Sequence, residues 1–140
     1  MTRFRRGLED DSGASAIEFA LVAPLFLLIV FATVMFSIYL ATWLGVSHAA
    51  AEGARASVAG LTATERQNLA IGRVQAVISG YAPLLDQTKV QVAYPTAAAG
   101  MFSVQVTYPL AQLNLARYAP LAPVPTVAPS RTATVTTGGY

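Results

Sequence analysis

The sequence has no cysteine and a single histidine, His48, among its 140 residues. Without cysteine there is no disulfide, no thiolate nucleophile and no cysteine-based metal site. A zinc site with one histidine would need several carboxylates, and the chain has only seven acidic residues. Neither a P-loop nor a dinucleotide-binding fingerprint occurs. We therefore predict no cofactor and no metal.

Catalysis by His48 has little support. A catalytic base needs a nucleophile and an orienting carboxylate. The candidate carboxylates, Glu65 and Asp86, are not tied to His48 by any motif spacing. We predict that the chain is not an enzyme and that His48 packs at an interface or against another helix.

Charge is also scarce. Charged residues make up 11% of the chain and apolar residues 54%, against about 25% charged in an ordinary globular domain. The net charge is only +2, and no basic run follows Arg6, so a nucleic-acid partner is not expected. A low charge fraction with a high apolar fraction instead indicates a membrane segment and a lipid partner.

A membrane helix is predicted where charge is absent altogether. No Asp, Glu, Lys or Arg occurs from Phe19 to Ala51. The most apolar part, residues 19–44, would be about 39 Å long as a helix, whereas a bilayer core of about 30 Å needs about 20 residues. This is too long for the apolar region of a cleaved secretory signal. Pro24 lies inside it and is expected to bend the helix. The arginines at positions 3, 5 and 6 predict a cytoplasmic N-terminus.

Helical character is expected to continue beyond the bilayer, from Ala14 to about Val58, with a same-face ion pair between Glu52 and Arg55. Gly45 and the alanines at positions 49–51 allow close contact with another helix in the membrane. Alternatively, these alanines simply favour helix formation.

The rest of the chain predicts a second helix and a small sheet. Thr62 and Glu65 form a capping pattern before a helix at about 63–79. Alternating apolar residues then indicate two antiparallel strands, in KVQVAY and MFSVQVTYP, and RTATVTT is a candidate third, edge strand. Four prolines between residues 119 and 129 preclude regular structure there.

These elements predict a membrane-anchored α+β protein: a long N-terminal transmembrane helix that continues outside the bilayer, a second helix and a small antiparallel sheet. We divide the chain into a cytoplasmic leader (1–13), the transmembrane helix with its extension (14–60) and an exported α+β domain (61–140) with the proline-rich loop 119–129. So small a domain has a thin core, so we expect it to dock onto the first helix or onto a partner.

Gly13 and Glu18 stand at the boundary between the leader and the apolar run. Glycine allows the extended backbone that a protease cleft needs, and cleavage after Gly13 would create an α-amine on Ala14. The Glu18 carboxylate could pair with that amine in its own chain or in a neighbour, offsetting the cost of its burial. Alternatively, the Glu18 side chain only extends to the cytoplasmic surface of the membrane, where its carboxylate stays in water.

The N-terminal region resembles the TadE-like family, minor pseudopilins of the Tad (Flp) tight-adherence pilus system. The resemblance covers about residues 3–58. It rests on the arginine-bearing leader, Gly13, the small residues 14–16, the Glu18–Phe19 pair, Ala20-Leu21-Val22, Pro24, the apolar run and the AAAEGAR sequence at 49–55.

The resemblance implies processing between Gly13 and Ala14 by a prepilin peptidase, with Glu18 and Phe19 serving recognition and assembly. The mature protein would be a structural, pseudopilin-like component of the bacterial inner membrane with a periplasmic C-terminal domain, which helps to initiate, anchor or tip a pilus. Its partners would be other pilins or pseudopilins, the prepilin peptidase and the inner-membrane assembly platform; incorporation into the extracellular fibre is left open. The alternative is a signal-anchored protein whose exported domain is a binding module.

Overall fold

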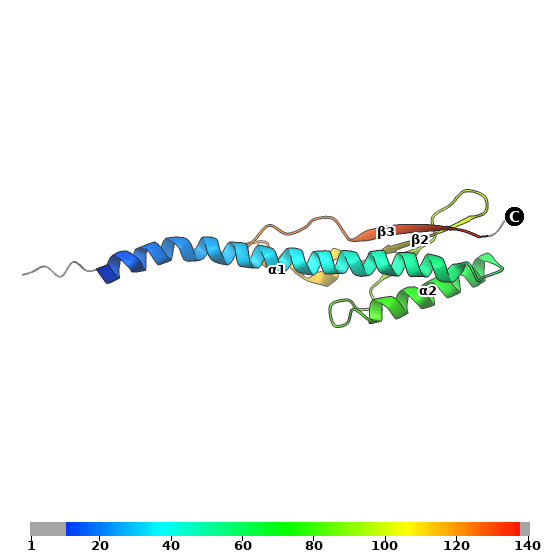
Figure 1. Cartoon of the computed structure of the whole chain (residues 1–140), viewed down its shortest axis with the longest axis horizontal. Coiled ribbons are helices and arrows are strands. Elements are labelled where there is room, and N and C mark those ends of the chain that lie inside the picture. Colours follow the sequence, from blue (N-terminus) through cyan, green and yellow to red (C-terminus); the bar gives the residue numbers. More distant parts are fainter. Residues whose placement is uncertain (1–10, 138–140) are drawn as a thin grey trace, which may run out of the picture.

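A single long helix organises the molecule (Figure 1). The computed structural model describes residues 11–137, so most of the expected leader, residues 1–10, lies outside the described residues. Helix α1 runs over Asp11–Ser57, 47 residues, and continues as one helix through Pro24. The expected helix from about Ala14 to Val58 is therefore confirmed.

Helix α2 (Ala63–Ser79) begins where the capping pattern predicts. The Thr62 hydroxyl accepts a hydrogen bond from the Glu65 backbone N–H at 3.2 Å, and the Glu65 carboxylate accepts one from the Leu61 N–H at 2.9 Å. Both donors belong to the first turn or its approach, where the helix itself offers no acceptor. The apolar stripe of α2, Ala70, Val74 and Ile78, is buried.

The predicted antiparallel sheet is present, in the order β1 (Gln91–Ala93), β2 (Met101–Thr107), β3 (Ser130–Thr136). Both pairings are antiparallel, and β3 is an edge strand as expected. Val104 and Val106 of β2 are fully buried on one face of the sheet. On the other face, hydroxyls bridge β2 and β3, with 2.7 Å between Ser103 and Thr134. The alternation in the sequence thus separates an apolar face from a polar one.

Two short 3-10 helices, η1 (Leu110–Leu113) and η2 (Leu115–Tyr118), follow β2 and were not predicted from the sequence. The proline-rich stretch 119–129 has no helix or strand, as expected. In Figure 1 this stretch, drawn in orange, returns alongside α1 before it enters β3.

The second half of α1 lies between α2 on one side and the sheet on the other (Figure 1). Its small residues, among them Ala49, Ala50 and Ala54, are buried in the main core with Val74 of α2 and Val104 of β2. The expected docking of the C-terminal part onto the first helix is therefore confirmed. The first half of α1 extends beyond all other elements.

The small residues of α1 serve this internal packing. A Cβ atom on Gly45 would lie 2.8 Å from a methyl carbon of Leu85. Ala49 and Ala50 are completely buried in the chain's own core. The prediction that these positions contact another helix within the membrane is thus wrong for Gly45, Ala49 and Ala50, because α2 and the segment after it occupy that surface.

Two helical glycines provide a matched test of this packing. A Cβ on Gly53 would lie 2.7 Å from Val74 Cγ2 and 3.3 Å from the Ala70 carbonyl oxygen, whereas a Cβ on Gly72 would meet nothing within 4 Å. Gly53→Ala should destabilise the protein by about 1–3 kcal/mol through overpacking, and Gly72→Ala should stabilise it by up to ~1 kcal/mol through helix propensity. Thermal unfolding of the full chain in mild detergent, followed by circular dichroism, measures both; equal shifts for the two variants would contradict the close packing of α1 and α2.

Candidate functional site

The predicted processing and assembly residues lie together in the first turns of α1. Gly13 and Ala14 are in the first turn, since α1 begins at Asp11. Glu18 follows Ala14 by four positions, so the two residues share one face of the helix about 6 Å apart along its axis. All residues from Gly13 to Ala20 have exposed side chains. The structure therefore brings Ala14 and Glu18 onto one accessible surface.

Among residues 13–51, Glu18 is the one charged residue, and its surroundings are apolar. Its neighbours Ile17 and Phe19 are 65% and 74% exposed, and Leu21 and Val22 are exposed as well. Such a density of exposed apolar side chains is unusual on a soluble protein. Further along, Pro24 is also exposed; the bend that we expected there remains a prediction, and α1 carries no break at this position.

Helix α1 is the one helix of residues 11–137 that is long and apolar enough to cross a membrane, by length and composition. Of residues 13–30, all but Ala23 are exposed, in contrast to the core helix of a soluble protein. Hydroxyl groups within the apolar stretch donate back to the helix, as Thr33 does to the Ile29 carbonyl at 2.8 Å and Ser37 to the Thr33 carbonyl at 2.8 Å. These bonds keep polar atoms satisfied where water is absent.

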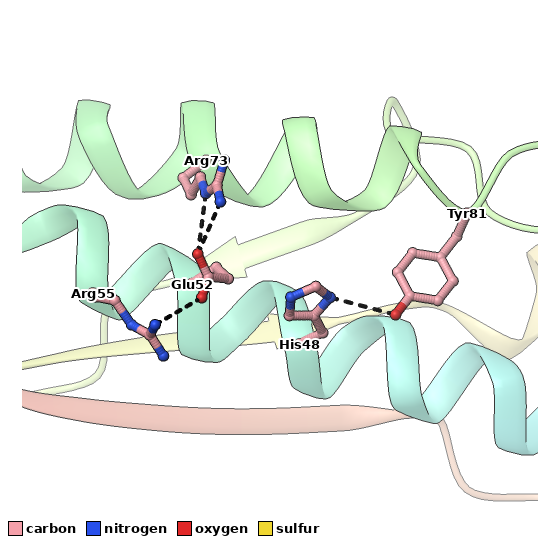
Figure 2. A network of polar contacts seen from close by, with 5 residues as sticks. All are labelled: His48, Glu52, Arg55, Arg73 and Tyr81. Carbon is pink, nitrogen blue, oxygen red and sulfur yellow. Dashed lines mark hydrogen bonds and ion pairs between the residues drawn. The ribbon is translucent and has the colours of Figure 1, made fainter.

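A second group of polar side chains joins the two helices (Figure 2). Arg73 of α2 donates from two nitrogens to one oxygen of Glu52 on α1, at 2.9 and 3.3 Å. Arg55 lies 3.3 Å from the other oxygen, so the predicted pair of Glu52 and Arg55 is present. The hydrogen bond from Arg73, together with the positive charge of Arg55, lowers the pKa of the Glu52 carboxyl.

His48 lies beside this network and contacts Tyr81. Its Nδ1 is 3.4 Å from the Tyr81 hydroxyl, and the two rings meet edge to face. Of the carboxylates considered from the sequence, Glu65 accepts from the Leu61 N–H and Asp86 accepts from Thr88; these Thr88 hydrogen bonds lower the pKa of Asp86. The structure thus places His48 on an exposed part of α1, in contact with the turn that follows α2.

Sequence reasoning missed Arg73 and Tyr81. Arg73 is 21 residues from Glu52, and Tyr81 is 33 residues from His48. No local spacing links them, because each contact depends on how α2 packs against α1. Within residues 11–137, no cluster of three or more His, Asp or Glu side chains could hold a metal ion.

Comparison with known proteins finds a family match in the N-terminal part of the chain. Residues 13–55 match the family model described as TadE-like protein, which confirms the resemblance over this segment. No curated protein and no solved structure matches the chain. The matched segment begins at Gly13 and ends at Arg55, so it spans the candidate processing site, the apolar helix and Glu52. The match supports the interpretation that the protein is a component associated with the Tad pilus. Its one N-terminal apolar helix fits a single-pass membrane anchor.

The Glu52 network predicts a pH-dependent difference between two arginine variants. Because Arg73 bridges two helices and Arg55 is 75% exposed on the same helix as Glu52, Arg73→Gln should lower the melting temperature at pH 7 more than Arg55→Gln. The pKa of Glu52 is lowered by folding, so its contribution to stability is present above the ordinary carboxyl pKa and is lost as the pH falls through the folded value.

The difference between the two variants should therefore begin to shrink as the pH falls below the ordinary glutamic acid pKa of about 4.3, and it should disappear only below the lowered pKa of Glu52 in the folded protein. Thermal unfolding of the full chain in detergent at neutral and acidic pH measures it. A difference that persists unchanged in acid would show that Arg73 acts through packing of its aliphatic stem and not through charge.

Proposed function

We propose that this protein is a minor pseudopilin of a Tad pilus system, a non-catalytic structural component that helps to initiate, anchor or tip the pilus. The observation that carries the proposal is the N-terminal part of α1. Over residues 13–30 its side chains are exposed apart from Ala23, and they are apolar apart from Ser15 and the carboxylate of Glu18. The match of residues 13–55 to the TadE-like model supports it.

In this proposal the helix crosses the bacterial inner membrane once, with the N-terminus in the cytoplasm and the C-terminal domain in the periplasm. The arginines of the leader favour that orientation. The partners are other pilins or pseudopilins, the prepilin peptidase and the assembly platform of the inner membrane.

Processing would cut the bond between Gly13 and Ala14. That bond lies in the first turn of α1, so the turn has to open before it can enter a protease cleft in extended form. Glycine lowers the cost of opening, since it is about 1 kcal/mol less favourable in a helix than alanine. After cleavage, the new amine of Ala14 lies one turn from the Glu18 carboxylate, or within reach of that of a neighbouring subunit.

Substitution of Gly13 tests processing without disturbing the fold. Because a Cβ on Gly13 would meet nothing within 4 Å, a substitution there does not crowd the fold and acts on cleavage, through recognition by the peptidase and through the cost of opening the turn. We expect Gly13→Leu to retain the leader and Gly13→Ala to be cut in part. N-terminal sequencing of protein from membranes with and without the peptidase measures this; a wild-type chain that still begins at Met1 would contradict the proposal.

Substitution of Glu18 tests assembly. Glu18→Ala should be cut normally and then fail to complement pilus formation, because the amine of Ala14 loses the carboxylate that offsets its charge. Glu18→Gln retains the size of the side chain without the charge and should fail similarly, whereas Ser15→Ala, an exposed neighbour, should assemble. Pili are counted by electron microscopy in a strain that lacks the wild-type chain. Full complementation by Glu18→Ala would count against the assembly role.

A further inference from the structure

The proline-rich part of the chain lies against the apolar half of α1. Pro120 and Leu121 line the same shallow recess as Pro24, Leu27, Leu28 and Phe31 of α1. Figure 1 shows this stretch running beside α1 towards the protruding end of the helix and back to β3. The tip of the loop is therefore level with residues that belong to the predicted membrane span.

The exposure of α1 limits where the outer boundary of the hydrocarbon can fall. Up to Val30 the helix is exposed on nearly all sides, whereas Met35, one turn after Phe31, is only 3% exposed. Apolar side chains remain exposed on one face as far as Leu44. The boundary thus lies between Phe31 and Leu44, and every position in that interval places Leu121 at or below it.

The tip is suited to an apolar environment. Leu121 is 50% exposed, and Val127 is exposed too. Of the six residues 118–123, two are prolines without a backbone N–H, and Leu121 and Ala122 both donate to the Tyr118 carbonyl, at 2.8 and 3.0 Å. Few backbone N–H groups are therefore left without a partner. Removing water from such unpaired groups is the main free-energy cost when an irregular segment enters the bilayer surface.

Charge at the ends of the segment fits a lipid surface. No charged residue occurs between Arg117 and Arg131, and no acidic residue follows Asp86. The Arg131 guanidinium lies 6.0 Å from the ring of Trp43 on α1. Tryptophan favours the headgroup level, and arginine there can bind lipid phosphates. Arg131 thus lies at the outer boundary of the hydrocarbon or outside it, while Leu121 lies deeper in the bilayer.

We propose that residues 118–130 form a second membrane contact, in which Leu121 enters the outer leaflet beside α1 and Arg131 faces anionic lipid headgroups. The contact would hold the domain at a fixed tilt on the bilayer. The proposal rests on the membrane anchor of the proposed function, but not on processing at Gly13 or on pilus assembly.

Single-cysteine labelling tests the contact, since the chain has no cysteine of its own. The full chain is reconstituted into phosphatidylethanolamine–phosphatidylglycerol vesicles, with the fluorophore NBD attached to Leu121→Cys. Phe26→Cys, in the span, serves as the positive control. The negative control is Leu61→Cys, 88% exposed in the link between α1 and α2. Lipids with a nitroxide high on the acyl chain should quench NBD fluorescence at position 121 at least about twofold more strongly than at position 61.

The controls separate the possible failures. If position 26 is quenched and position 121 is quenched no more than position 61, the loop contact is refuted while the anchor stands. If position 26 is not quenched either, the anchor itself fails and the loop proposal falls with it. As a second measurement, quenching at Val127→Cys should be weaker than at position 121, because residue 127 lies nearer to β3; equal or stronger quenching would overturn the proposed depth order.

Discussion

The close approach of α2 and the sheet to α1 is the constraint on which the rest of the structure depends. It is possible because α1 presents hydrogen and methyl side chains there: Gly53 would collide with Val74 if it carried a Cβ, and Ala50 and Ala54 are buried. A domain of about 80 residues has too little apolar area for a substantial core of its own. It gains that area by packing on the second half of α1, so the core of the domain includes part of the same helix as the apolar N-terminal half.

The two halves of α1 are therefore suited to different environments, lipid for the first and the core of the folded domain for the second. Its first half exposes Phe19 and other large apolar side chains, a surface that suits lipid and not water. On the face of its second half that meets α2 and the sheet, small side chains such as Ala49, Ala50 and Ala54 are buried. The transition is continuous in the backbone, since α1 has no break between Asp11 and Ser57. Any tilt or rotation of the helix in the bilayer is then transmitted directly to the folded domain.

Much of this fold could be predicted because its signals are local. The Thr62–Glu65 cap fixed the start of α2, and alternation in β2 gave both its extent and its buried face. The short 3-10 helices after β2 have no comparable pattern. The contacts between Arg73 and Glu52 and between Tyr81 and His48 depend on tertiary packing. Small residues on α1 indicate that another element packs closely against it, but they do not identify that element. Similarly, four prolines indicate an irregular loop but not that it lies along α1.

The place of β3 in the sheet has a consequence for how the protein acquires its structure. The strand covers residues 130–136, near the end of the chain, yet it pairs along all of β2 and packs against α1. Contacts between such distant parts of a sequence form late, because the intervening chain must first be brought into place. The sheet therefore stays incomplete until residues 130–136 have joined β2, and the irregular segment between the two strands has to be placed along α1 (Figure 1) before the domain can mature.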